Sequence, residues 1–210
     1  MSRDQSEVKL NFINRSNDVN NSQIVIFQKN LATDIDEPAV AWTVIKYCGQ
    51  GSNHPFTYPM AMTVATNDSF GNYTPQLAAQ NGQMFHVSLT GSSDTLSYLG
   101  QATSPKEVHI RNNLSMGAIN ASIFKDGRLL AIKTSVVPQQ RAVFEFKPTL
   151  WIGVVSKVEA GQVMDSAIIS DVNTELSLLG ITSADIVMTG GGPGANSTPF
   201  VFNLENIVWA

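Results

Sequence analysis

A chain of 210 residues is long enough for one large domain or two small ones, and it can bury a core without a metal or a disulfide staple. Its 13 basic and 17 acidic residues give a net charge of −4 without charged runs, which excludes the basic face that nucleic-acid binding requires. Charged residues make up 14% of the chain against about 25% in typical globular proteins, and neutral polar residues replace them.

The polar tail 1–7 lacks the apolar core of a secretory signal, so we expect a cytoplasmic protein, with leaderless release left open. No apolar run approaches the roughly 18 residues of a transmembrane helix. Cys48 is the single cysteine, so an intramolecular disulfide is excluded. Because no stretch rich in proline or charge divides the remainder, we predict that residues 8–210 form a single domain.

The first half of the chain reads as strands separated by turns. Segments 9–14 and 23–28 flank a turn rich in Asn and Asp, which predicts a hairpin. Residues 39–48 have apolar side chains at both odd and even positions, as in a strand covered on both faces or in a short helical turn that leads into a strand. Segment 56–65 predicts a strand that Pro59 confines to an edge or a bulge.

The middle of the chain alternates apolar and polar residues at the spacing of a sandwich. Three short strands are predicted at 83–89, 95–99 and 107–111. Strands 119–125 and 128–134 flank Asp126-Gly127, the composition of a two-residue type I′ turn. Two further strands at 141–147 and 150–155 complete a predicted four-stranded meander.

The last third has looser patterning. One short helix is allowed within 163–179, because Ser170 or Asp171 can cap it and Gly180 suits its end. Strands follow at 184–189 and from 198 to 209, and we expect the terminal strand to close a sheet, with pairing to a neighbouring subunit as the alternative. The whole pattern predicts an all-β antiparallel sandwich of about eight to thirteen strands, with at most one short helix.

No catalytic or metal motif is complete. His54, His86 and His109 are far apart in sequence, so a zinc or catalytic site would need distant segments to converge. No nucleophile motif surrounds a serine or Cys48. We therefore expect no cofactor, no metal and no catalytic residues, and an enzyme with a histidine-containing site remains the last of three hypotheses.

Aromatic residues crowd a window that is rich in loop residues. Aromatic rings on loops can stack on sugars or lie at a lipid interface. Plugging the open end of the sandwich is the alternative role. The residues predicted to bind such a ligand are Tyr47, His54, Phe56, Tyr58 and Tyr73.

A glycine-rich segment at 189–198 precedes the last strand. It lacks the lysine and the following helix of a phosphate-binding loop, so it is either a plain connection or a contact loop at an interface. The predicted assembly contacts are Gly190, Gly191, Gly192, Gly194 and Trp209.

Low charge and a strand-like C-terminus favour a non-enzymatic sandwich protein that acts through its surface. Because neutral polar surfaces repel one another weakly, self-assembly into a homo-oligomer is the leading hypothesis. The second hypothesis is a lectin-like or cytolysin-like module that binds a glycan or a lipid headgroup through the aromatic residues.

Overall fold

The computed structural model describes all residues except 1–6, 21, 33–37, 166–167 and 170–173. Its described part contains sixteen strands and one 3-10 turn, Gly194–Asn196, and the strands form four sheets of four strands each. The all-β, sandwich-like prediction is therefore confirmed. The predicted helix caps, Ser170 and Asp171, and most of the predicted polar tail lie outside the described residues. The prediction that this helix ends at Gly180 is wrong, because Thr174–Ser177 is a strand that pairs in a sheet.

The strands belong to two compact units, which we describe separately. Unit 1 comprises Met1–Gln28, Pro38–Met60 and Pro148–Ala210, and unit 2 comprises Lys29–Glu37 and Ala61–Lys147. The prediction of one domain over 8–210 stays a prediction. The strand number exceeds the expected eight to thirteen, partly because three strands of three or four residues have too little alternation to be visible in the sequence.

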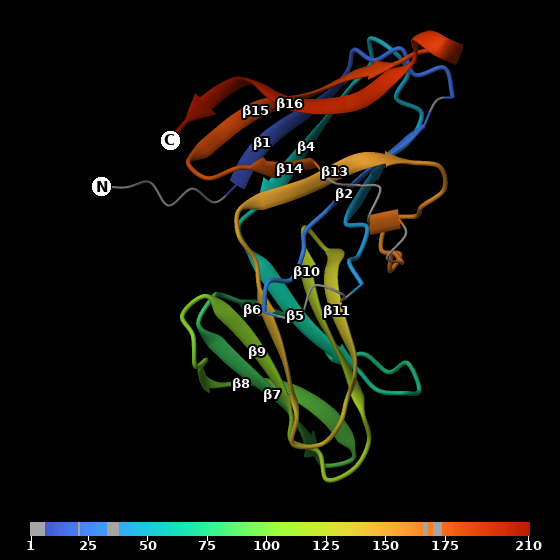
Figure 1. Cartoon of the computed structure of the whole chain (residues 1–210). Helices are drawn as coiled ribbons and strands as arrows, with labels where there is room; N and C mark the ends of the chain where they lie inside the picture. Colours follow the sequence, from blue (N-terminus) through green and yellow to red (C-terminus); the bar gives the residue numbers. More distant parts are fainter. Residues whose placement is uncertain (1–6, 21, 33–37, 166–167, 170–173) are drawn as a thin grey trace. The chain divides into compact units, whose positions relative to one another are not determined.

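Unit 1 is built from two sheets, ordered β16-β15-β1-β4 and β14-β13-β2-β3, which lie one over the other in Figure 1. Its strands are β1 (Glu7–Asn14), β2 (Gln23–Phe27), β3 (Thr43–Ile45), β4 (Asn53–Pro59), β13 (Thr149–Val155), β14 (Thr174–Ser177), β15 (Ile181–Gly191) and β16 (Thr198–Trp209). The first and last parts of the chain meet here, because β1 pairs in parallel with β15 and antiparallel with β4.

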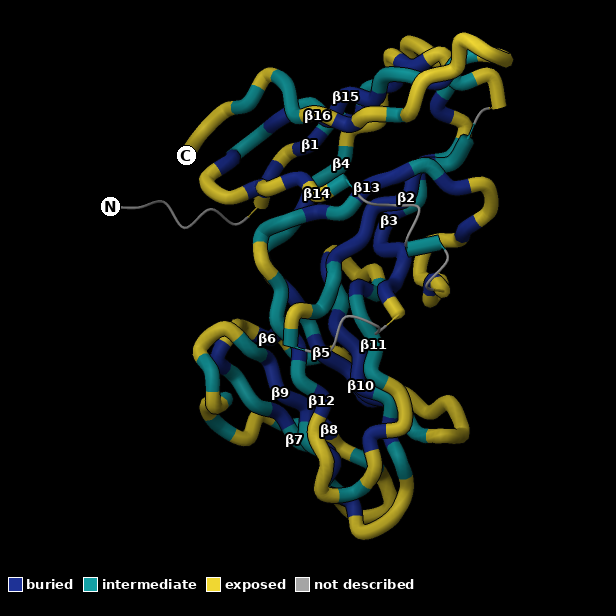
Figure 2. The backbone as a smooth tube through the Cα atoms, in the orientation of Figure 1, coloured by how far each residue is buried: buried dark blue, intermediate teal, exposed yellow. Residues whose placement is uncertain are grey.

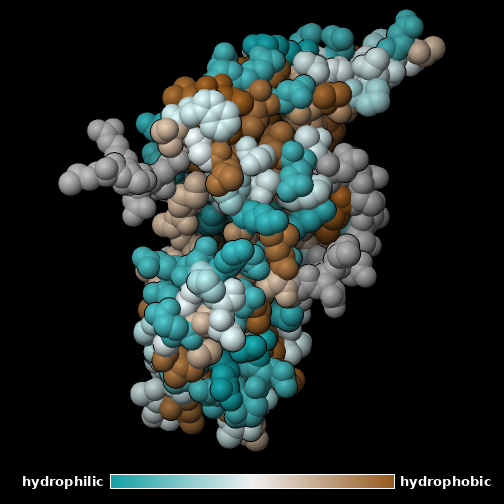
Figure 3. Space-filling view, turned by 60° about the vertical axis from the view of Figure 1, so that its left-hand side comes forward, coloured by the Kyte–Doolittle hydropathy of each residue, from teal (hydrophilic) through white to brown (hydrophobic). Residues whose placement is uncertain are grey.

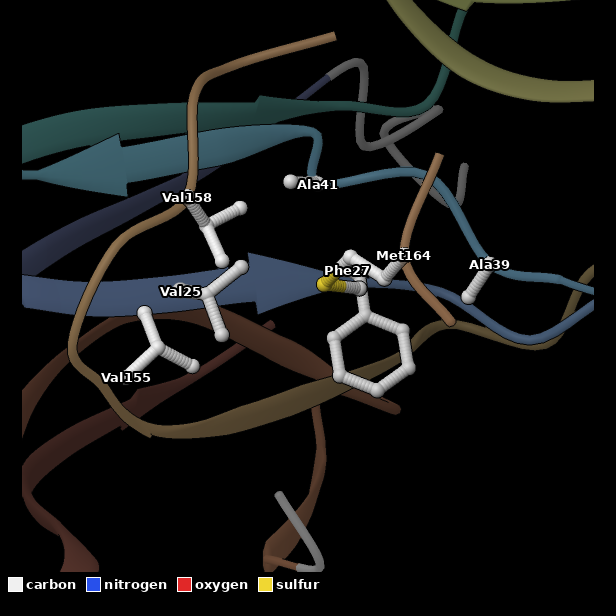
Figure 4. Close-up of a cluster of buried hydrophobic side chains, with 7 residues drawn as sticks. All are labelled: Val25, Phe27, Ala39, Ala41, Val155, Val158 and Met164. Carbon is white, nitrogen blue, oxygen red and sulfur yellow. The ribbon is translucent and has the colours of Figure 1, made fainter. Parts of the chain in front are cut away.

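Apolar side chains of unit 1 are buried on both sides of β2. Figure 4 shows Val25 and Phe27 of this strand beside side chains from β13 and from the segments before β3 and after β13. The cluster consists of Val25, Phe27, Ala39, Ala41, Val155, Val158 and Met164. Burial of each large apolar side chain contributes about 1.5–3 kcal/mol to folding stability. These contacts therefore hold the segments before β3 and after β13 against the sheet that contains β2.

Unit 2 contains the sheets β11-β10-β5-β6 and β12-β9-β7-β8. Its strands are β5 (Met62–Asn67), β6 (Leu77–Ala79), β7 (Gln83–Thr90), β8 (Ser93–Gln101), β9 (Glu107–Asn112), β10 (Ile119–Lys125), β11 (Arg128–Val136) and β12 (Arg141–Glu145). The predicted hairpin at Asp126-Gly127 is confirmed: Lys125 pairs with Arg128, and the two turn residues have φ of 52° and 67°.

Four strand predictions are wrong, the first two of them because pairing is non-local. β1 and β2 lie in different sheets, so the predicted first hairpin does not form. The predicted meander also fails, since β12 pairs with β9 whereas β13 pairs with β2 and β14. Segment 56–65 is broken at Met60 and Ala61 into β4 and β5, which belong to different units. Of segment 39–48, only Thr43–Ile45 is a strand.

Candidate functional site

A polar hollow of about 240 Å³ lies on the sheet β16-β15-β1-β4. Alternation along the strands places Lys9 and Asn11 of β1 on the same face as Ser183 and Asp185 of β15, because Lys9 is paired with Ser183 and Asn11 with Asp185. The lining residues that we call the polar hollow are Lys9, Asn11, Pro55, Ser183, Asp185 and Asn206, with Leu10 and Ala184 beneath them.

Amide groups from both neighbouring strands hold the Asp185 carboxylate. Asn11 Nδ2 donates to Asp185 Oδ1 at 3.3 Å, and Asn206 Nδ2 donates to Asp185 Oδ2 at 2.7 Å. Donors on either side fix the rotamer of Asp185, so the carboxylate is presented in one orientation to anything that enters the hollow.

A β-bulge places Asn206 at the rim of the hollow. Ser183 pairs with Val208 and Asp185 with Glu205, so β16 contains one more residue than β15 between these pairs. Asn206 takes a left-handed φ of 49°, which asparagine tolerates better than most residues. Bulges re-aim side chains in this way, often next to binding sites.

No residue of the polar hollow belongs to the binding or assembly sites predicted from the sequence. Its residues come from segments about 170 positions apart, and no local motif joins them. One signal was present in the sequence of β16. Apolar residues occupy even positions at first (Phe200, Phe202 and Leu204) and odd positions afterwards (Ile207 and Trp209), as expected where one residue is inserted into a strand.

Strand β16 is an open edge of this sheet, because it pairs with β15 and with no second strand among those described. Figure 2 colours most of it as exposed or intermediate, and Phe202 is its one buried residue. Its single charged side chain, Glu205, accepts from Arg15 Nη1 at 2.9 Å, so the edge has no unpaired charge. The predicted terminal strand therefore covers β15 but leaves its own outer side open.

Apolar side chains gather at the end of this edge. Leu179, Val208 and Trp209 are 72%, 54% and 64% exposed, and Ala210 N–H donates to the Gly180 carbonyl at 2.9 Å, which holds the chain end beside the β14–β15 turn. In Figure 3, hydrophobic atoms gather on the face that carries the C-terminal end. We call these three residues the C-terminal patch; it contains the predicted contact Trp209.

The predicted glycine contacts divide into two kinds. A Cβ at Gly190 would overlap the Pro199 carbonyl oxygen, and one at Gly191 would lie 2.7 Å from the Phe200 ring. These two glycines therefore allow β15 and β16 to approach closely. Gly192 and Gly194 have ordinary or open surroundings and belong to the connection before β16.

Four of the predicted ligand residues lie in unit 1 but not on one surface. Tyr47 is 85% exposed in a turn, whereas His54, Phe56 and Tyr58 lie on β4 rather than on a loop. Tyr58 is buried, its hydroxyl donates to Gln28 Oε1 at 3.2 Å, and burial raises its pKa to about 12. Its ring packs edge-on against Trp42, so Tyr58 is a core residue.

Tyr73 lies in unit 2, beside an aromatic residue on a tightly held turn. Asp68 Oδ1 accepts from the backbone N–H groups of Phe70 and Asn72, both at 2.9 Å, and Asp68 Oδ2 accepts from Asn72 Nδ2 at 2.8 Å. Hydrogen bonds from Asn72 lower the pKa of Asp68. Phe70 and Tyr73 are 89% and 69% exposed, so the turn presents two rings to solvent.

The three histidines do not form one site in the described structure. His54 belongs to unit 1, and the other two to unit 2. The His109 ring is buried and its Nε2 lies 2.6 Å from Glu107 Oε2, whereas His86 Nδ1 lies 3.0 Å from Asn113 Nδ2. Among the residues described, no three His, Cys, Asp or Glu side chains are grouped so that they could hold a metal ion.

Comparison with known proteins gives no relative: no family model, no curated protein and no solved structure matches the chain. Within the described part of the chain, no helix has the length and apolar character needed to cross a membrane.

Proposed function

We propose that the protein is a non-enzymatic sandwich protein that assembles into a homodimer by pairing β16 of one copy with β16 of a second copy. The single observation that carries this proposal is the long, apolar and charge-neutralised open edge of β16. Antiparallel pairing of two identical edges is self-complementary, so it closes into a two-fold dimer rather than a fibre.

The other sheet edges of the described structure support this choice because each is short or blocked. β4, the opposite edge of the same sheet, contains Pro55 and Pro59, which have no N–H to donate. β3, β6 and β14 have three or four residues. β12 is partly covered, since Leu31 N–H donates to the Glu145 carbonyl at 2.9 Å.

Two longer edges remain, and both have features that discourage pairing. β11 carries Arg128 and Lys133 and has two register shifts against β10. β8 has a register shift where it opposes Met84 and Phe85. Charged side chains and bulges are the devices that protect edges from association. β16 also has register shifts against β15, at Pro199–Phe200 and on both sides of Val208, but the five residues Val201–Glu205 between them form an unbroken pairing segment.

A Val201→Lys variant tests this interface. Val201 is 46% exposed at the first position of the pairing segment, so a lysine there adds one charge per copy to the interface without entering the core. We expect the dimer dissociation constant to rise at least about tenfold, since like charges brought together at an interface cost more than 1 kcal/mol. The measurement is sedimentation equilibrium across a concentration series.

The matched control is Leu89→Lys, which places the same charge on an exposed leucine of unit 2. Equal dissociation constants for wild type and Leu89→Lys, with a weaker Val201→Lys dimer, support β16 pairing. A Val201→Lys dimer as tight as the wild type would show that the interface lies elsewhere.

A second candidate function, lipid-interface binding, is favoured by the turn that holds Phe70. An aromatic ring on a preorganised turn loses little conformational entropy on insertion between headgroups. Tyr73 lies at the same turn, with an amphipathic ring that suits the interface.

Flotation with zwitterionic phosphatidylcholine vesicles tests this candidate, with Phe70→Ser as the variant. We expect the vesicle-bound fraction to fall at least about threefold, because burying one aromatic ring contributes on the order of 1.5–3 kcal/mol. Tyr47→Ser, at an exposed aromatic residue of unit 1, is the control. Wild-type protein that does not float with the vesicles would contradict lipid binding.

A further inference from the structure

We propose that the polar hollow is a binding site for a single neutral sugar ring. The inference is independent of self-assembly, because Lys9, Asn11, Ser183 and Asp185 lie on β1 and β15. Asn206 lies on β16, but outside the pairing segment.

Hydrogen-bond donors and hydrogen-bond acceptors both remain available around the hollow. Asn11 and Asn206 use their Nδ2 groups on Asp185, and no hydrogen bond within the described residues engages their Oδ1 oxygens. Lys9 and Ser183 also have no side-chain partner there, so an ammonium and a hydroxyl face a carboxylate and two amide oxygens. A sugar hydroxyl both donates and accepts, so adjacent hydroxyls match this mixture.

The charges of the hollow favour an uncharged ligand. Lys9 and Asp185 are its two ionic residues, and they cancel. An anion that approached Lys9 would meet the Asp185 carboxylate on the neighbouring strand, and a hard cation would find one carboxylate and an ammonium in place of six to eight oxygen ligands. A neutral hydroxylated ligand avoids both repulsions.

The size and walls of the hollow select one ring. A volume of about 240 Å³ is below the roughly 300–1,000 Å³ of pockets for drug-sized ligands. Pro55 supplies an apolar wall for the C–H face of a ring. The Asn206 bulge places its amide at the rim in a left-handed conformation, the kind of local strain that collects at ligand sites.

Saturation-transfer NMR with the full chain tests the proposal. The probes are the methyl glycosides of glucose, galactose, mannose and N-acetylglucosamine. We expect saturation of the ring protons of at least one of them, with a millimolar dissociation constant because the site is open. Absence of transfer to all four would overturn the proposal, as would inorganic phosphate or glycine betaine displacing a bound glycoside at a lower concentration than free sugar does.

Asp185→Asn assigns the binding to this hollow, because it keeps the side-chain size and removes the charged acceptor. The new amide also faces one of the Nδ2 donors of Asn11 and Asn206, so one of these amides must turn its oxygen toward position 185 and loses it for the ligand. We expect the sugar dissociation constant to rise about tenfold, since hydrogen bonds to a charged group are roughly twice as strong as neutral ones. Glu175→Gln removes one negative charge from an exposed position on β14 of the same unit and should leave sugar binding unchanged.

Lys9→Gln is the second test, for the case in which Asp185→Asn lowers the folded fraction. Lys9 is exposed, so this variant should fold, and it should also weaken sugar binding. Sugar binding that neither variant changes would place the ligand elsewhere and overturn the assignment. The solution mass of the same variants separates the two proposals, because loss of sugar binding should leave the β16 dimer intact.

Discussion

A Gly190→Ala variant should lose about 2–5 kcal/mol of the free energy of unfolding. Gly190 has φ of 91° and lies where β15 meets the start of β16, and an added Cβ would overlap the Pro199 carbonyl oxygen. Left-handed backbone costs an alanine about 1–2 kcal/mol, and overpacking against backbone that cannot rotate away adds about 1–3 kcal/mol. Urea unfolding of the purified variant measures the loss.

Gly194→Ala is the matched control for this effect. Gly194 also has a positive φ, 57°, but an added Cβ there would have nothing within 4 Å. It should therefore cost about 1–2 kcal/mol, the backbone contribution without the overlap. Equal losses for the two variants would show that β15 and β16 do not approach closely at Gly190. Because β16 is also the proposed interface, the same comparison shows whether the glycine-rich segment acts through folding or through assembly.

A Lys125→Met variant should be more stable than the wild type at neutral pH. Lys125 ends β10 with 4% of its surface exposed, and burial lowers the pKa of its ammonium from 10.5 to about 8. Below pH 8 the ammonium is charged in the folded and in the unfolded protein, so the folded protein bears the cost of desolvating it. Between pH 8 and 10.5 the unfolded chain binds a proton that the folded chain has released, so wild-type stability rises through this window.

The stability difference between the two proteins should therefore narrow by about 3 kcal/mol from pH 7 to pH 11, at about 1.4 kcal/mol per pH unit within the window. Burial raises the pKa of Tyr58 to about 12, which acts in the opposite direction above pH 10. Both proteins retain Tyr58, so its contribution cancels in the difference. Urea unfolding at several pH values measures the difference, and a constant difference would contradict a buried ammonium with a lowered pKa.

Local chemistry could be predicted from the sequence, and strand partners could not. The Asp126-Gly127 turn is correct because both turn residues need a positive φ and their two strands are adjacent in sequence. β1 was predicted to pair with β2, the next strand along the chain, whereas it lies between β4 and β15. Alternation identifies a strand but does not say which edge it joins, because many edges accept the same pattern.

The candidate sites show the same division between local and non-local information. The apolar terminal strand was visible in the sequence because it depends on one segment, but its open outer edge was not, since the strand was expected to close a sheet. The polar hollow was not, because it needs the parallel register of Asn11 with Asp185 and the bulge at Asn206. Tyr58 was expected to face a ligand, but the pairing of β4 with β1 places it in the core beside Trp42. Aromatic residues near Gly and Asn in sequence are therefore not necessarily on loops.

The most direct test of the proposed assembly is the absolute mass in solution, by size-exclusion chromatography with light scattering over a concentration series. Pairing of β16 with β16 predicts a mass of about twice 22.7 kDa at high concentration, which falls toward 22.7 kDa on dilution and for Val201→Lys. A mass of 22.7 kDa at every concentration would contradict the proposal and leave β16 as an edge that the bulge at Asn206 is sufficient to protect.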